Sequence, residues 1–165
     1  MLEVFKQYVC DECGALIESP SQGLLEWRNK LDSNGKTIAT GFRIVHHIVV
    51  SPLRGVRPEG CYRYAPDSPD SECRPLSSIL PVATPFLMAF LHPGCFHSAS
   101  RDSCRIKDFN EFADLVRRLT IPYYEEARIY FEEALEDGFN YCDKETVFRE
   151  TNLQSLIRRY KGKSI

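Results

Sequence analysis

Two cysteines near the start of the chain have the spacing of metal ligands. Cys10 and Cys13 are separated by two residues, and Gly14 follows the second cysteine. A Cys-x-x-Cys pair followed by glycine forms a tight turn in which both thiolates face one tetrahedral Zn²⁺. The sequence therefore predicts a zinc knuckle at residues 10–14.

The other two ligands of this site have to come from later in the chain. A structural zinc ion takes four ligands, and Cys61 is the best candidate for the third. One residue of the His46-His47 pair is the best candidate for the fourth. Because side chains alternate along a strand, only one of the two can easily face the knuckle, and we expect His47 rather than His46. The alternative is a set of buried free thiols beside a packed histidine pair.

The remaining cysteines include a second group that could chelate a metal. The chain has seven cysteines, an odd number, and one tight Cys-x-x-Cys pair favours metal binding over disulfides. A second cluster contains His92, Cys95, His97 and Cys104. We expect this cluster to be the end of a helix followed by a loop with buried thiols, because free cysteine is among the most buried residue types.

The elements that position the knuckle are expected to be short antiparallel strands. Residues 3–9 and 15–17 are predicted strands on either side of it. The Asn34-Gly35 pair predicts a hairpin that joins strands near 24–30 and 37–50, with a bend near Gly41. Loop-forming residues dominate from 51 to 75. A metal ion would stabilise so small and loop-rich a region.

The rest of the chain has the periodicity of helices. Asp108 caps the clearest of them, which has one apolar stripe. In the helix that follows, Glu125 and Glu126 are expected to face solvent and Leu135 the interior. The expected elements are helices at 84–91 with Thr84 as N-cap, 108–119, 120–137 and 152–160, and a short strand at 146–149. The predicted fold is α+β: an antiparallel zinc-knuckle β-subdomain (1–75) packed on a C-terminal helical subdomain (76–165).

Composition limits the class of protein. The 165 residues are 43% hydrophobic and 27% charged, which is typical of a globular chain. No apolar run approaches the roughly 18 residues that a membrane helix needs, and the first residues do not resemble a secretion signal. We expect a cytoplasmic protein that does not bind a membrane.

A basic and aromatic segment offers a candidate surface for a partner. Arginine and aromatic side chains together can hold phosphates and stack on bases, so the partner could be nucleic acid or protein. The alternative is that these arginines offset the acidic helices within the chain. The sequence pI of about 6.1 is not typical of a dedicated nucleic-acid binder. The candidate residues are Trp27, Arg28, Arg43, Arg54, Arg57 and Arg63.

Two resemblances bear on function. The Cys10-x-x-Cys13-Gly14 knuckle with residues 42–47 is similar to the zinc-ribbon-like N-terminal modules of small bacterial proteins without an established activity. This resemblance implies a metal-stabilised module and no reaction. The stretch His46-His47-Ile48, followed by Pro52 and Gly55, resembles the core of HNH nucleases, in which a histidine activates water beside a divalent cation. Our first hypothesis is a non-enzymatic zinc-binding adaptor or regulator, and the alternative is a metal-dependent nuclease that uses His46 or His47.

Overall fold

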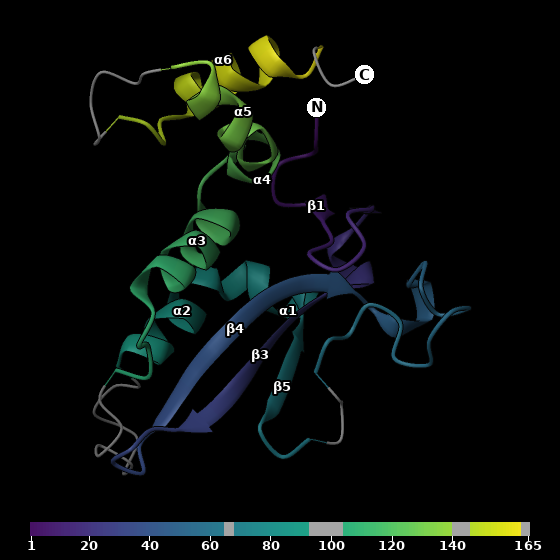
Figure 1. Ribbon diagram of the computed structural model, residues 1–165, viewed down its shortest axis with the longest axis vertical. Coiled ribbons are helices and arrows are strands. Elements are labelled where there is room, and N and C mark those ends of the chain that lie inside the picture. Colours follow the sequence, from purple (N-terminus) through teal and green to yellow (C-terminus); the bar gives the residue numbers. More distant parts are fainter. Residues whose placement is uncertain (65–67, 93–103, 140–145, 163–165) are drawn as a thin grey trace.

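The computed structural model describes residues 1–64, 68–92, 104–139 and 146–162 (Figure 1). As the sequence predicts, the fold is α+β, with antiparallel sheets and helices. The strands are β1 (Tyr8–Val9), β2 (Leu16–Ile17), β3 (Gly23–Leu31), β4 (Thr37–His46) and β5 (Ser71–Pro75). The helices are α1 (Leu76–Ile79), α2 (Ala83–Leu91), α3 (Phe109–Thr120), α4 (Tyr124–Ala127), α5 (Phe131–Glu136) and α6 (Glu150–Tyr160).

The described strands form a small hairpin and a larger sheet. β1 pairs with β2 around the knuckle, and the second sheet has the order β4-β3-β5 with antiparallel neighbours. The predicted Asn34-Gly35 turn joins β3 to β4. Gly35 has a φ of +73°, and the Asp32 side chain accepts hydrogen bonds from the backbone N–H groups of Asn34 and Lys36. The hairpin prediction is therefore confirmed.

β4 bends where the sequence predicts it and ends earlier than expected. Gly41 has a φ of +72°, and the register opposite β3 shifts beside it, between Glu26 and Arg28. Such a bulge turns the strand and increases its local twist. The strand ends at His46 because residues 48–50 form a 3₁₀ turn, so the expected extension to residue 50 is wrong.

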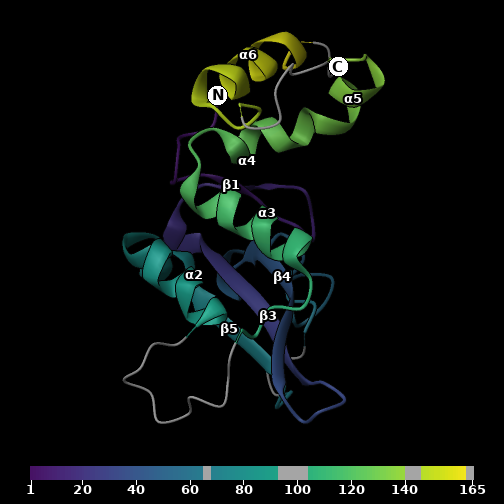
Figure 2. The same ribbon diagram turned by 90° about the vertical axis from the view of Figure 1, so that its left-hand side faces the viewer.

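The first apolar cluster joins the three-stranded sheet to helices α1, α2 and α3, and Figure 2 shows α2 and α3 on one face of the sheet. Its centre is aromatic: the Trp27 ring lies against Phe42, Phe86 and Phe90, with centroids 5.5–6.4 Å apart. Asp108 caps α3 as predicted by accepting hydrogen bonds from the N–H groups of Asn110 and Glu111.

The second apolar cluster is built by α4, α5 and α6. Its buried members are Tyr124, Ala127, Ala134, Leu153, Leu156, Ile157 and Tyr160. The chain therefore passes from one cluster to the other between residues 119 and 124, and α1–α3 share their cluster with the sheet. The predicted subdomain boundary at residue 75 stays a prediction. Figure 1 shows the β1 hairpin and α3 between the large sheet and the α4–α6 cluster.

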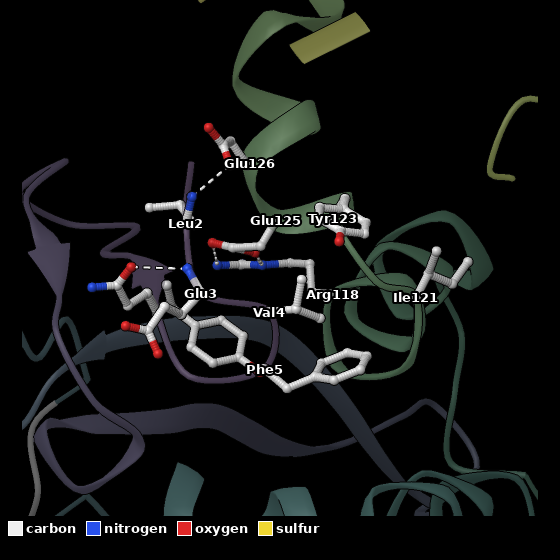
Figure 3. A pocket seen from close by; sticks show the side chains of 11 residues that line it. Leu2, Glu3, Val4, Phe5, Arg118, Ile121, Tyr123, Glu125 and Glu126 are labelled. Atoms are coloured by element: carbon white, nitrogen blue, oxygen red, sulfur yellow. Dashed lines mark hydrogen bonds and ion pairs between the residues drawn. The ribbon is translucent and has the colours of Figure 1, made fainter. Parts of the chain in front are cut away.

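The expected helix from 120 to 137 is broken into shorter pieces. Thr120 closes α3, and Tyr123 has a φ of +65°, which a continuous helix cannot contain. Glu125 and Glu126 are buried rather than exposed, while Leu135 is 75% exposed rather than buried. Both carboxylates can be buried because a guanidinium group or a backbone N–H donates a hydrogen bond to each of them. Figure 3 shows the Leu2 N–H donating to Glu126 at 2.6 Å and Arg118 beside Glu125.

Three other local predictions are wrong. The strand expected at 3–9 is limited to Tyr8–Val9, because residues 4–6 form a turn. Residues 146–149 form a turn that leads into α6 rather than a strand. Thr84 lies inside α2, which starts one residue earlier and has no side-chain cap. No helix in the described part of the chain is long and apolar enough to cross a membrane.

Candidate metal centre

The knuckle turn holds its two cysteines in place through the backbone. Cys10 follows β1, and its N–H donates to the carbonyl of Ala15 at 3.0 Å. The N–H of Gly14 donates back to the Cys10 carbonyl at 2.9 Å, and Gly14 has a φ of +70°. Glycine adopts this left-handed conformation without the steric cost of a Cβ. The predicted turn around Cys13 is therefore formed.

Four ligand atoms converge at this turn. The thiols of Cys10, Cys13 and Cys61 and one imidazole nitrogen of His46 all lie within 4.8 Å of one another. The Nδ1 atom of His46 is 3.5 Å from the Cys13 sulfur and 3.8 Å from the Cys61 sulfur. Ligands of a tetrahedral ion with bonds of about 2.0–2.3 Å are separated by roughly 3.5–3.8 Å. The cluster can therefore bind a metal ion.

The imidazole of His46 is oriented by its second nitrogen. Nε2 lies 3.1 Å from the carbonyl oxygen of Leu16, and because that oxygen only accepts, Nε2 carries the proton of the neutral ring. Nδ1 then directs its lone pair at the three sulfurs. A histidine that ligates a metal typically has its other nitrogen fixed in this way.

The structure places His46, and not His47, in the cluster, which corrects the expected order of the two. His46 is the last residue of β4, on the face that points at the knuckle. The His47 Nδ1 instead accepts a hydrogen bond at 3.3 Å from the N–H of Val49 and begins the 3₁₀ turn. Only one histidine faces the knuckle, as strand alternation requires, but the sequence does not indicate which face of β4 meets the cysteines.

Cys61 is buried and has a polar neighbour that the sequence did not identify. The Ser51 hydroxyl donates to the Cys61 sulfur at 3.0 Å. The Ser51 oxygen in turn accepts from the N–H of Leu53 at 3.2 Å. Gly60 has a φ of +59°, and a Cβ there would collide with Ser51. A close turn at residue 60 therefore keeps the hydroxyl against the thiol.

The thiol of Cys13 resists ionisation when no cation is present. Burial, the largest cause, and the neighbouring thiols Cys10 and Cys61 together raise the pKa of Cys13 to about 12, and the hydrogen bond from the N–H of Ala15 opposes the shift. Negative charges so close together need a compensating positive charge, and a divalent cation provides it while displacing the protons. The donor set therefore fits a metal better than free thiolates.

No family model, curated protein or solved structure matches this chain. Its function is therefore inferred from the arrangement of its own residues.

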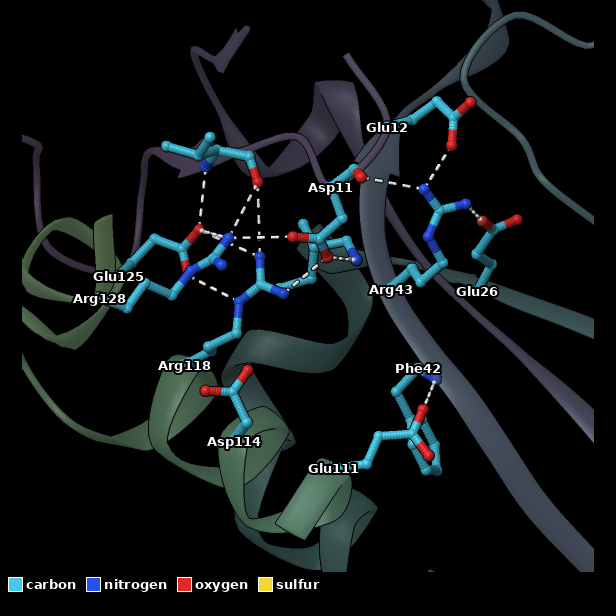
Figure 4. A network of polar contacts seen from close by, with 12 residues as sticks. Asp11, Glu12, Glu26, Phe42, Arg43, Glu111, Asp114, Arg118, Glu125 and Arg128 are labelled. Atoms are coloured by element: carbon cyan, nitrogen blue, oxygen red, sulfur yellow. Dashed lines mark hydrogen bonds and ion pairs between the residues drawn. The ribbon is translucent and has the colours of Figure 1, made fainter. Parts of the chain in front are cut away.

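The two residues between the knuckle cysteines connect the cluster to the rest of the fold (Figure 4). Asp11 forms ion pairs with Arg118 at 2.6 Å and with Arg128 at 2.9 Å, and both arginines also contact Glu125. Although burial favours the neutral acid, Arg118 and Arg128 hold the pKa of Asp11 below its usual value. The knuckle is thus attached to α3 and to the α4–α6 cluster by charged groups.

Glu12 connects the knuckle to the sheet. Its carboxylate contacts the guanidinium groups of Arg43 and Arg57, which lower the pKa of Glu12. Arg43 also pairs with the buried Glu26 of β3 at 3.1 Å. None of these partners is identifiable from the sequence, because the spacing along the chain carries no signal for them.

The proposed partner-binding residues are separated into two groups by the structure. Trp27 is only 5% exposed, in the aromatic centre of the first cluster, so it is not available to stack on a base. Arg28 pairs with Asp70, and Arg43 and Arg57 pair with Glu12, as in the alternative of internal charge compensation. Arg54 and Arg63 are the exposed members of the set.

The second Cys/His cluster lies partly outside the described residues. Cys95 and His97 fall in the range 93–103, and Cys142 falls in 140–145, neither of which is described. Cys104 is described, and its thiol donates to the carbonyl of Ile106 at 3.5 Å. Among the described residues, the Cys10/Cys13/His46/Cys61 group is the one arranged for a metal ion.

Proposed function

We propose that the Cys10/Cys13/His46/Cys61 cluster holds a structural Zn²⁺ and that the protein is a non-enzymatic adaptor or regulator. The observation that carries the proposal is the convergence of three thiols and one oriented imidazole within 4.8 Å. Three thiolates with one imidazole form a donor set typical of closed structural zinc sites. Such a site leaves no open position for water, so it stabilises structure instead of activating a substrate.

The metal centre also determines which part of the chain is presented to a partner. His46 and Cys61 are both ligands, and the 47–60 loop between them is anchored at its two ends. Val56 in this loop is 83% exposed, and Val49, Val50 and Arg54 of the same loop are also exposed. Exposed apolar side chains on one ordered loop offer a surface for a protein partner.

A protein partner fits this surface better than nucleic acid does. The exposed loop offers valines and Arg54, whereas the aromatic residue expected to stack on bases, Trp27, is in the core. Most of the neighbouring arginines already have carboxylate partners, so few charges remain for phosphates. A partner with an apolar patch and an acidic group beside it would complement the loop.

The contacts of the two described histidines His46 and His47 do not favour the nuclease alternative. Both ring nitrogens of His46 are directed at protein groups, and Nδ1 of His47 accepts from the backbone. A general base must be able to reach its water. The two functions therefore predict different effects of changing these histidines.

Elemental analysis of the purified protein tests the metal site. We expect one zinc per chain, lost in Cys10→Ser, Cys61→Ser and His46→Ala and retained in the controls His47→Ala and Cys73→Ser. Cys73 is exposed on β5 and outside the cluster, so it is a matched control for the cysteine changes. Absence of zinc in the wild type, or its retention in the Cys61 and His46 variants, would contradict the proposal. A His47 variant that keeps zinc but loses Mg²⁺-dependent DNA cleavage would favour the nuclease.

The adaptor role is tested separately at the loop. Val56→Asp should abolish capture of a specific protein partner while zinc content is unchanged. Leu31→Asp is the control, because Leu31 is also exposed but lies at the far end of β3. Equal capture by both variants would show that the loop is not the interface, and saturable binding of a fluorescent oligonucleotide that Val56→Asp leaves intact would favour nucleic acid.

A further inference from the structure

A second candidate site lies on the helical face of the large sheet, away from the metal centre. It is a cavity of about 580 Å³ between β3, β5, α1 and α2, on the face that Figure 2 shows covered by α2. Trp27, Phe86 and Phe90 supply aromatic surface to its wall. A cavity of this size with mostly apolar walls is typical of small-molecule sites.

The charged groups that the described residues bring to this cavity are both positive. Of these residues, Arg74 and Arg105 line it, and no carboxylate does. Arg74 is exposed on the edge strand β5, and the described residues offer it no ion pair. The Arg105 guanidinium lies 5.2 Å from the centroid of the Phe90 ring, and its Nη2 donates to Oδ1 of Asn29. The cavity therefore combines a flat apolar surface with two cations.

Two buried N–H donors beside this cavity have no acceptor in the part of the chain that the structure describes. They are Nε1 of Trp27 and Nε of Arg105, and neither has a hydrogen-bond partner. Buried donors are almost always paired, and each exception calls for an explanation. Both atoms belong to residues that line the cavity, but both are covered by protein atoms, so neighbouring side chains must move before either donor reaches a ligand.

We propose that the cavity binds a small organic anion, specifically an aromatic carboxylate. Its carboxylate would accept hydrogen bonds from Arg74 and Arg105, and its ring would lie against Phe86 and Phe90. A small shift of the side chains that cover the Trp27 N–H would bring that donor to the ligand. This site shares no residue with the metal cluster and does not depend on it.

Trp27 provides a direct measurement, because it is the only tryptophan in the chain. In a ¹H–¹⁵N spectrum of the zinc-loaded protein, the single indole N–H resonance reports on the wall of the cavity. Titration with 1-naphthoate should shift this resonance saturably. The neutral, nearly isosteric 1-naphthamide should bind about tenfold more weakly or worse, because it cannot make the charge-assisted bonds.

Charge reversal gives a matched comparison. Arg74→Glu should weaken naphthoate binding by about tenfold or more, whereas Arg54→Glu, the same change on the 47–60 loop, should leave it unchanged. Arg74 is exposed, so an otherwise unchanged spectrum will show that the variant is folded. The proposal is overturned if the indole resonance does not move at about 1 mM naphthoate, if naphthamide binds equally well, or if both arginine variants behave alike.

Discussion

The carboxylate of Asp11, between the two knuckle cysteines, pairs with the guanidinium of Arg118 on α3, with Oδ2 and Nη1 2.6 Å apart. Arg118 is 5% exposed and also contacts Glu125, so its charge is almost completely removed from water. The turn that carries the metal ligands is thus also the turn that attaches the helices. Metal binding and the docking of α3 are expected to be energetically coupled.

We predict that Asp11→Asn destabilises the protein by about 3 kcal/mol, because removing one member of a buried ion pair leaves its partner poorly compensated. Urea unfolding of the zinc-loaded protein measures this free energy. Glu59→Gln removes the same charge at an exposed position and should change it by less than about 0.5 kcal/mol. Equal effects of the two changes would show that the Asp11–Arg118 pair contributes nothing specific.

Gly41 is predicted to be intolerant of a side chain. Its φ of +72° disfavours any other residue, and a Cβ there would collide with the hydroxyl of Tyr64, which donates to the Gly41 carbonyl. We expect Gly41→Ala to destabilise the protein by about 2 kcal/mol or more. Gly55→Ala is the matched control, since a Cβ at Gly55 would have no atom within 4 Å and its φ is not positive. Thermal unfolding of the two variants should therefore differ clearly, and similar melting temperatures would contradict this explanation of the bend.

The sequence could predict those features whose signals are local. The Asn34-Gly35 hairpin, the bend at Gly41, the Asp108 cap and the Cys10-x-x-Cys13 turn each depend on a few neighbouring residues with special backbone or hydrogen-bonding properties. The spacing of Cys10 and Cys13 also identifies two members of the metal cluster, and Cys61, the best candidate for the third ligand, lies in the cluster too.

The features that could not be predicted depend on contacts between distant segments. A helical pattern assigns Glu125 and Glu126 to solvent. Arg118 and Arg128 nevertheless pair with Glu125, and the N–H of Leu2, 124 residues away in the chain, donates to Glu126. Tertiary contacts of this kind override local preference. The choice of His46 over His47 has the same origin, because it depends on the face that β4 turns toward the knuckle.

Tyr124 is predicted to make stability fall at alkaline pH. Burial and a 2.6 Å hydrogen bond to Asp114 raise its pKa well above the ordinary value of 10.0. Between these values the unfolded chain loses the phenolic proton and the folded chain keeps it, so the unfolded state binds fewer protons and stability declines as pH rises. This group contributes a slope of about 1.4 kcal/mol per pH unit above pH 10.

Tyr124→Phe removes that proton, so unfolding free energies measured from pH 8 to pH 11 should decline less steeply in the variant than in the wild type. Below pH 10 the variant should be less stable by about 1 kcal/mol, because the hydrogen bond to Asp114 is lost. The two curves should then converge at high pH. Parallel curves over this range would show that the phenol ionises equally easily in the folded and unfolded states.

Ser51 is predicted to tune the affinity of the metal centre without determining its stoichiometry. Its hydroxyl donates to the Cys61 sulfur at 3.0 Å and thereby stabilises negative charge on a ligand. We expect Ser51→Ala to weaken zinc binding by about 10-fold, within the range typical of groups that hydrogen-bond to metal ligands, while one zinc per chain still binds at saturation. Competition with a zinc chelator of known affinity measures this change.

Ser78→Ala is the matched control for that measurement, because the Ser78 hydroxyl donates to the carbonyl of Pro75 at 2.8 Å, outside the metal cluster. Its zinc affinity should equal that of the wild type. Because the Ser51 oxygen also accepts from the N–H of Leu53, Ser51→Thr should retain part of the affinity that Ser51→Ala loses, provided the extra methyl group is accommodated beside Gly60. An affinity unchanged in Ser51→Ala would show that the cluster holds its metal through the four ligands alone, with no contribution from the hydroxyl behind Cys61.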